Sequence, residues 1–274
     1  MLINTIDCHT HCFPPRIALA ALEQLRQNSG GLKPWTDGTA DGLISQMDQC
    51  GIQASWVLNI ATTPGQQQAV NNFAAAGNSA RIISFGSVHP DAPDALDELE
   101  RMASLGIRGL KLHPFFQHFA ADDPKMKPIY RHAAALNLVT VFHAGYDIGF
   151  ADTEWASPKA LAKALDWFDG APVVAAHLGG SFCWQAVIQW LAGKPIYFDT
   201  AFSCGHIPLP EAKRLIEAHG IDRILFGSDL PWCDPLQELA FIDCLGLTAS
   251  EKQQVLSGNA CRLIPGKQPQ IPEV

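Results

Sequence analysis

The sequence has no unbroken stretch of about 18 apolar residues, the length that a membrane-crossing helix requires. Its first residues also lack a basic segment followed by an apolar one, the pattern of a secretory leader. These absences predict a cytoplasmic protein with no membrane partner. The net charge is −8 and no basic stripe is present, so we do not expect nucleic acid as a partner.

Several chemical motifs are absent as well. The eight cysteines are scattered with no Cys-x-x-Cys pair, which favours free thiols over a disulfide framework. No Gly-x-Ser-x-Gly motif is present, which disfavours a serine hydrolase, and the glycine motifs of P-loop and dinucleotide-binding proteins are missing. The chemistry must therefore come from other residues.

The sequence does contain short β-branched runs that alternate with helical stretches along nearly its whole length. This alternation is typical of repeated βα units and a parallel sheet. The 274 residues suit a single α/β barrel, so we predict one domain over 1–274 with the (β/α)8 TIM-barrel fold. The eight expected strands are 3–9, 52–60, 82–88, 107–113, 138–143, 172–177, 195–200 and 222–229.

The longest connection, 13–51, follows the first strand. We expect helices near 15–28 and 38–50 on either side of a Gly30-Gly31 break, and we predict that this insertion acts as a lid over the barrel mouth. A helix over 92–105 is predicted to begin at Asp91 as its N-cap, and His219 is expected to cap the end of a helix over 211–219 as a partly cationic ring.

The most informative motif is Asp7-Cys8-His9-Thr10-His11 at the end of the first strand. Because side chains alternate along a strand, His9 and His11 point the same way and can converge on one metal ion. His143, His177 and Asp229 end three other predicted strands, and chemistry in such barrels occurs at the carboxyl ends of the strands. His9, His11, His143 and Asp229 could therefore ligate one divalent ion and leave a position for water, with His177 beside it.

The chain resembles the amidohydrolase superfamily, in the amidohydrolase-related branch that includes aminocarboxymuconate-semialdehyde decarboxylase and pyrone-dicarboxylate lactonase. The resembling segments are DCHTH (7–11), GLKLHP (109–114), VFHAG (141–145), AHLGG (176–180), YFDTA (197–201), ILFGSDLPW (224–232) and GNACRL (258–263). The resemblance implies the barrel fold, the same four metal ligands, a catalytic role for His177, and the homodimer that is common in this branch.

Mechanistically, one metal ion, zinc or manganese, would lower the pKa of a water or polarise a carbonyl group. Asp229 would act as ligand and base, while His177 would hold the water or stabilise the oxyanion. Asp7 is either an acceptor that orients a ligating imidazole or a buried carboxylate paired elsewhere.

Lys111 and His113 leave alternatives open. Binuclear members of the superfamily carry a carbamylated Lys or a Glu near the position of Lys111, whereas a free Lys111 would contact substrate. His113 could contact substrate, ligate a second ion or cap its strand. We favour a mononuclear site.

The leading hypothesis is a metal-dependent hydrolase of a small, carboxylated lactone, amide or ester. A metal-dependent, non-oxidative decarboxylase or hydratase of the same branch is the main alternative, because the same ligands serve both reactions. A non-catalytic metal-binding barrel and a metal-dependent deoxyribonuclease are disfavoured by the intact set of rim residues and by the acidic charge balance, respectively.

Overall fold

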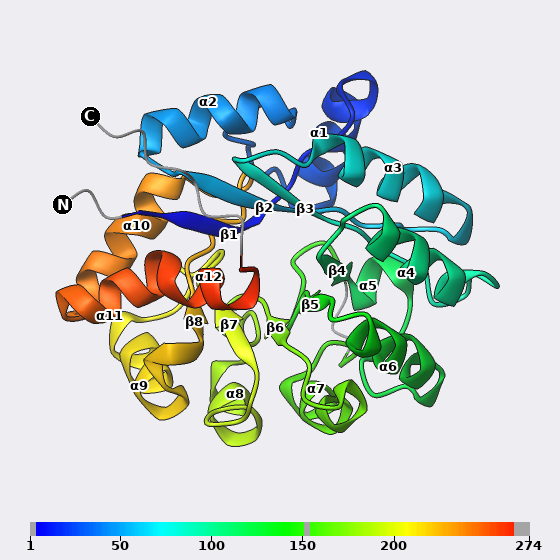
Figure 1. The fold of residues 1–274 in the computed structure, drawn as a ribbon. Coiled ribbons are helices and arrows are strands. Elements are labelled where there is room, and N and C mark those ends of the chain that lie inside the picture. The colour runs from blue at the N-terminus through cyan, green and yellow to red at the C-terminus, as the bar shows by residue number, and fades with distance from the viewer. Residues whose placement is uncertain (1–3, 151–153, 266–274) are drawn as a thin grey trace.

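The computed structural model describes residues 4–150 and 154–265. Eight parallel strands surround a common centre, with helices on the outside (Figure 1). Seven of the eight predicted runs contain one strand each, and the first run, 3–9, overlaps β1, which ends one residue later, so the predicted (β/α)8 barrel is confirmed. The strands are β1 (Ile6–Thr10), β2 (Ala54–Leu58), β3 (Ile82–Phe85), β4 (Gly109–Leu112), β5 (Val139–Phe142), β6 (Val173–Ala175), β7 (Tyr197–Asp199) and β8 (Ile224–Leu225).

Helices follow the strands in chain order. The α-helices are α1 (Pro15–Asn28), α2 (Ala40–Cys50), α3 (Gln67–Gly77), α4 (Ala95–Ser104), α5 (Pro114–Gln117), α6 (Lys127–Ala135), α7 (Pro158–Ala164), α8 (Trp184–Trp190), α9 (Leu209–His219), α10 (Pro235–Cys244), α11 (Ala249–Gln253) and α12 (Asn259–Leu263). Short 3-10 turns are η1 (Pro64–Gln66), η2 (Pro124–Met126), η3 (Leu165–Phe168) and η4 (Ile221–Arg223), and η5 (Gln254–Gly258) is a π-helical turn. Many of these helices begin with proline in the first turn, where its missing N–H costs nothing.

Backbone hydrogen bonds close the barrel at two seams. Between β3 and β4, the Gly86 N–H donates to the Gly109 carbonyl at 3.0 Å. A Cβ on Gly109 would lie 2.0 Å from the Phe85 ring, so only glycine allows this approach. Between β8 and β1, the Cys8 N–H donates to the Phe226 carbonyl at 2.8 Å. Closure brings the carboxyl ends of all eight strands to one rim.

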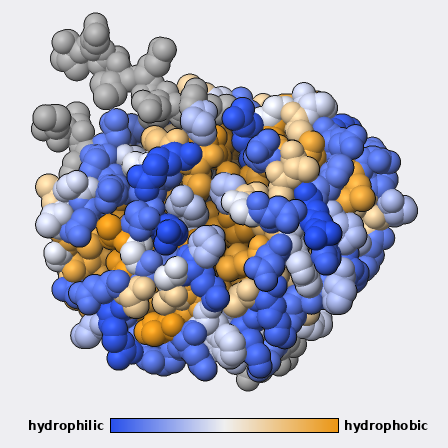
Figure 2. Space-filling view, turned by 60° about the horizontal axis from the view of Figure 1, so that its bottom comes forward, coloured by the Kyte–Doolittle hydropathy of each residue, from blue (hydrophilic) through white to orange (hydrophobic). Residues whose placement is uncertain are grey.

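Two apolar clusters stabilise the barrel. The first cluster lies between the barrel and the surrounding helices and contains strand residues that point outward, such as Val57 and Leu110. The second fills the inside of the barrel with strand residues that point inward, such as Trp56 and Val141. It includes Ala260 of α12, which covers the end opposite the rim. On the molecular face that Figure 2 shows, hydrophilic residues dominate, and hydrophobic ones are visible mainly in recesses between them. No helix in the described ranges is both long and apolar enough to cross a membrane.

Two local predictions are wrong. The predicted N-cap Asp91 forms an ion pair with Lys125 at 3.0 Å, and α4 begins later, after Asp94. Burial lowers the pKa of His219 to about 4, so its ring is neutral at pH 7 and not cationic. The ring stacks on that of Phe198, with 3.8 Å between the ring centroids. The helices expected at 15–28 and 38–50 are present as α1 and α2, while the lid motion expected of this connection stays a prediction.

Candidate active site

A cavity of about 520 Å³ opens at the carboxyl ends of the strands. Every rim residue predicted for metal binding or catalysis lines it, together with both residues whose roles were left open. These lining residues are His9, His11, Lys111, His113, His143, His177 and Asp229. The predicted site residues, apart from Asp7, therefore face one common space.

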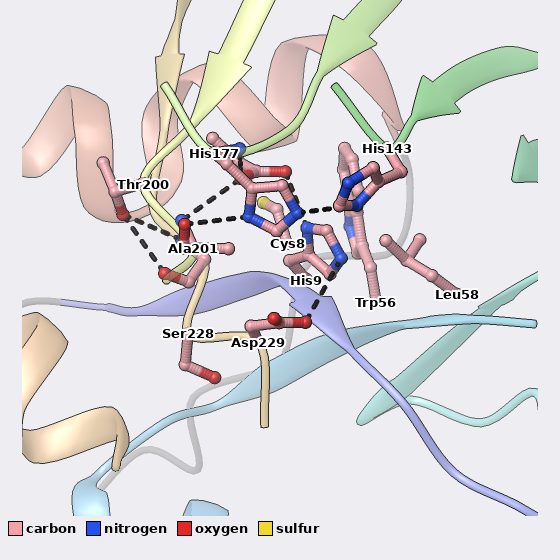
Figure 3. Close-up of polar contacts among 12 residues, drawn as sticks. Cys8, His9, Trp56, Leu58, His143, His177, Thr200, Ala201, Ser228 and Asp229 are labelled. Atoms are coloured by element: carbon pink, nitrogen blue, oxygen red, sulfur yellow. Dashed lines mark hydrogen bonds and ion pairs between the residues drawn. The ribbon is translucent and has the colours of Figure 1, made fainter. Parts of the chain in front are cut away.

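The centre of the cavity wall is formed by His9, His11 and Asp229, here called the inner group. Asp229 Oδ1 lies 3.2 Å from Nε2 of His11 and 3.5 Å from Nε2 of His9. Figure 3 shows His9 and Asp229 facing each other across the end of β1. The ligand atoms of the three residues all lie within 4.8 Å of one another, which is close enough for one metal ion.

The hydrogen bonds of the two rings fix where their protons lie. His9 Nδ1 lies 2.9 Å from Asp199 Oδ2, and His11 Nδ1 lies 2.9 Å from the Leu58 carbonyl oxygen. Both partners are acceptors, so each Nδ1 carries the proton and each Nε2 presents a lone pair. Two lone pairs thus face a carboxylate oxygen, an arrangement that a cation stabilises. Two imidazoles and one carboxylate, with a fourth position open, form a typical catalytic zinc site.

The backbone brings the inner group together in an unusual conformation. Asp229 has a φ of +69°, in the left-handed region that few residues other than glycine adopt. Its N–H donates to the His9 carbonyl at 2.8 Å, which joins it to β1. A Cβ on Gly227 would lie 2.9 Å from the Cβ of His9, so glycine is needed where the chain passes β1. Such constrained backbone is typical of functional sites.

His177 lies beside the inner group but its ring is already hydrogen-bonded. Its Nδ1 donates to the Ala201 carbonyl at 3.0 Å, and its Nε2 lies 3.1 Å from Nδ1 of His143 (Figure 3). A neutral His177 therefore presents an acceptor at Nε2, and it becomes a donor there only when the ring carries a second proton.

His143, the predicted fourth ligand, is not grouped with the three residues of the inner group, and its role as a metal ligand stays a prediction. It belongs to a second set with His113 and Asp147, here called the outer group, whose ligand atoms also lie within 4.8 Å of one another. The rings of His113 and His143 stack with 4.3 Å between their centroids, and His113 Nε2 lies 3.3 Å from Asp147 Oδ2. His113 Nδ1 accepts from the Phe116 N–H, so its Nε2 carries the proton and donates to Asp147.

Lys111 is fully buried on β4, with Nζ 3.4 Å from Nε2 of His9. Burial lowers the pKa of its ammonium group to about 8, although the charges of Asp199, Asp229 and Asp147 oppose this shift. The same desolvation holds the pKa of His9 well below its usual value. A partly neutral lysine at this position can act as a cation or as a proton acceptor.

Asp7 does not contact an imidazole ring. Its carboxylate accepts from the N–H and hydroxyl of Ser228 and from the backbone N–H of His9. The pairing of β1 with β2 shifts register between Asp7 and Thr10, so simple alternation from Asp7 to His9 fails. Of the two alternatives left open for Asp7, the structure has the carboxylate paired elsewhere.

Asp199 takes the place expected of Asp7, and sequence reasoning gave it no role. Its Oδ2 accepts from the His9 ring, while Oδ1 accepts from the backbone N–H groups of His177 and Ala201. It ends β7 at the rim, so the strand-end rule that found the other residues could have found it. Asp147 was also missed, because it lies in a long loop with no strand to mark it.

The eight-stranded barrel and its rim of histidines and carboxylates define the class of metal-dependent barrel enzymes. The family model described as Amidohydrolase matches residues 6–266, and the chain belongs to this family. No curated protein matches the sequence.

Solved structures share the fold at low identity. A 5-carboxyvanillate decarboxylase from Sphingomonas paucimobilis is 19% identical with a TM-score of 0.71, and the match covers 95% of this chain and 98% of that one. A probable 2-pyrone-4,6-dicarboxylic acid hydrolase from Acinetobacter baumannii is 18% identical with a TM-score of 0.69 over the same shares. An uncharacterised TIM-barrel protein from Bordetella bronchiseptica is 17% identical with a TM-score of 0.73, again over 95% and 98%.

Proposed function

We propose that this enzyme is a metal-dependent hydrolase that cleaves a lactone, amide or ester bond in a small acidic substrate. One observation carries the proposal: in the wall of a cavity, the lone pairs of two imidazoles face one carboxylate oxygen. Asp229 Oδ1 lies 3.2 Å from His11 Nε2 and 3.5 Å from His9 Nε2. A cation stabilises this arrangement of acceptors, and the Lys111 ammonium group approaches only one of them, His9 Nε2, at 3.4 Å. The cytoplasmic location and the homodimer expected from the sequence stay predictions.

The inner group would hold the ion, zinc or manganese, through Nε2 of His9, Nε2 of His11 and Oδ1 of Asp229. When bound, such an ion supplies Lewis acidity, which polarises a carbonyl group and lowers the pKa of a water. Asp229 then accepts the proton of the attacking water at a carboxylate oxygen and returns it to the leaving group. Asp199 keeps the His9 ring in the tautomer that presents Nε2.

In this proposal, His177 and Lys111 interact with the substrate and the attacking water. His177 Nε2 would exchange its 3.1 Å contact with His143 Nδ1 for one on the substrate side. It accepts a hydrogen bond from the water when the ring is neutral and donates to the oxyanion when the ring is protonated. The Lys111 ammonium group lies next to the inner group, 3.4 Å from His9, where it can attract a carboxylate. Both groups are more than nine-tenths buried, so their electrostatic interactions are weakly screened by solvent.

Decarboxylation is the second candidate, and one feature favours it. The cavity that holds Lys111 is lined by apolar and aromatic residues, including Phe116 and Phe202. A carboxylate that is transferred from water into such surroundings is destabilised relative to neutral carbon dioxide. The carbon that loses carbon dioxide needs a proton, which Asp229 or His177 could deliver. The matched 5-carboxyvanillate decarboxylase shares this fold.

Product analysis distinguishes the two reactions. We would incubate zinc-loaded and manganese-loaded protein with a panel of lactones, carboxylated dienes and hydroxylated aromatic acids, and measure products by mass spectrometry. Hydrolysis adds one water to the substrate, whereas decarboxylation removes carbon dioxide. Turnover that survives both chelation and Asp229→Asn would contradict the proposed metal chemistry.

A further inference from the structure

Part of the cavity lining is apolar and comes from two helices outside the barrel strands. It is formed by side chains of α1 and α3, here called the apolar arm: Ile17, Ala21, Leu25, Ala69, Val70 and Phe73. Leu58, the last residue of β2, and Ile60, which follows that strand, also line the cavity. The Leu58 carbonyl accepts from His11, so the arm is continuous with the candidate metal site.

The arm is separate from the core packing of its helices. On α1, Ile17, Ala21 and Leu25 recur every four residues and therefore share one face. The helix packs into the protein through another pair, Ala18 and Leu22, which are buried. Ile17 remains 45% exposed, which is unusual for a residue whose helix already has a buried face. The fold alone therefore does not account for the apolar side chains of the arm.

Three of the four described charged residues that line the cavity lie outside the helices of the arm, and the fourth, Arg16, is on α1. Among its described lining residues, the cations are Arg16 and Lys111, and the anions are Asp147 and Asp229. Lys111 is the only one of these cations in the barrel wall, so the deep end offers a single positive side chain to an acidic substrate. None of the described lining residues on α3 is charged.

The size of the cavity supports an elongated occupant. Its volume of about 520 Å³ lies within the range of roughly 300–1,000 Å³ for pockets that enclose drug-sized ligands. A compact acid bound at the inner group would leave the apolar arm filled with water, which is unfavourable against apolar side chains.

We propose that the substrate is amphiphilic, with one acidic or carbonyl head at the inner group and an extended alkyl or aryl part along α1 and α3. The head position rests on the proposed function, whereas the apolar part rests on the arm itself. The arm would thus select the substrate by the length of its apolar chain.

The test uses alkane hydroxamates, whose head chelates metal ions and whose chain length can be varied. Binding of acetohydroxamate, butanohydroxamate and octanohydroxamate to the zinc-loaded and zinc-free protein is measured by titration calorimetry. We expect the dissociation constant to fall by roughly twofold to fourfold per added methylene group, because each is transferred from water to an apolar wall.

Matched variants locate the effect. Ile17→Asn and Leu25→Asn add a polar amide to the arm and should weaken octanohydroxamate binding by about threefold to tenfold, with acetohydroxamate unchanged. Leu19→Asn makes the same kind of change on the same helix, at a side chain that is 75% exposed and does not line the cavity. This control should bind all three probes as the unmodified protein does.

The outcomes separate the two proposals. A chain-length effect that is reduced in Ile17→Asn but unchanged in Leu19→Asn supports the arm, whether or not zinc is needed. Zinc-dependent binding with no chain-length effect, or with equal effects in both variants, overturns the arm and leaves the proposed function standing. Binding that is independent of zinc overturns the metal site of the proposed function.

Discussion

The inner and outer groups contain the same residue types, two histidines and one aspartate, and differ in where the protons lie. In the inner group, Asp199 and the Leu58 carbonyl take the Nδ1 protons, so both Nε2 lone pairs point at Asp229. In the outer group, the Phe116 N–H donates to Nδ1 of His113, so Nε2 carries the proton and satisfies Asp147.

This difference shows that the hydrogen-bond partner of Nδ1 decides whether Nε2 of the same ring carries a proton or a lone pair. In the outer group Asp147 accepts a hydrogen bond from His113, whereas in the inner group the Asp229 oxygen faces two ring lone pairs, of which only that of His9 has a donor, Lys111, at 3.4 Å. Burial lowers the pKa of His113 to about 4, so its ring is neutral at pH 7 and its hydrogen bond to Asp147 is retained. We therefore expect metal at the inner group and not at the outer one.

The largest predicted effect is loss of the metal. Purified protein should carry about one equivalent of zinc or manganese, and the double variant His9→Ala with His11→Ala should carry almost none and lack activity. His113→Gln should keep the metal, because the outer group does not ligate it. Metal content is measured by plasma mass spectrometry. A content near two equivalents that falls in His113→Gln would contradict the assignment and would support a second ion near Lys111.

The next effect is on turnover. Asp229→Asn should lower the rate by about 10²–10⁴-fold, because an amide cannot accept the proton of the water. Folding should persist, since asparagine tolerates the left-handed conformation that Asp229 adopts. Asp147→Asn is the matched change in the outer group and should lower the rate far less. Equal losses in the two variants, measured as kcat with circular dichroism as the folding control, would remove the distinction between the groups.

A smaller effect, on metal affinity, should follow from changing Asp199, which accepts the Nδ1 proton of His9. Asp199→Asn should weaken metal affinity by about 10–100-fold, because an amide holds the Nδ1 proton of His9 less firmly than a carboxylate does. Asp7→Asn, which changes a carboxylate bound to Ser228, should affect metal affinity less. Competition with a fluorescent zinc chelator measures both. If Asp7→Asn had the larger effect, Asp7 and not Asp199 would be the residue that positions the ligands.

The smallest effect concerns a neutral histidine outside both groups. His219 has a pKa of about 4, below the usual value of 6.5, so the unfolded chain binds a proton between these pH values and the folded chain does not. Its contribution should fall by about 2 kcal/mol from pH 7 to pH 5, and stability should rise again with pH. Urea unfolding of the protein and of His219→Gln at both pH values should show their difference change by this amount. A constant difference would mean that the ring is not held neutral, and would weaken the same argument for His113.

The sequence predicted the part of the site that strand ends determine. His9 lies on β1, His11 directly follows its end, and Asp229 follows β8, so closure of the parallel barrel brings them to one rim. The partner of each ring could not be predicted. Asp199 meets His9 across 190 positions of sequence, and many aspartates end strands without such a role. The separation of His143 from the inner group depends on its contacts with His177 and His113, which no pattern encodes.

By itself, the sequence determined the barrel, its rim and the residue types available for chemistry, because alternation of strands and helices and the placement of polar residues at strand ends are local properties of the chain. The tertiary structure alone decided which imidazoles present lone pairs, which aspartate orients them and which helices form an apolar wall. These depend on hydrogen-bond partners and packing neighbours that are distant in the chain and meet only when the barrel closes.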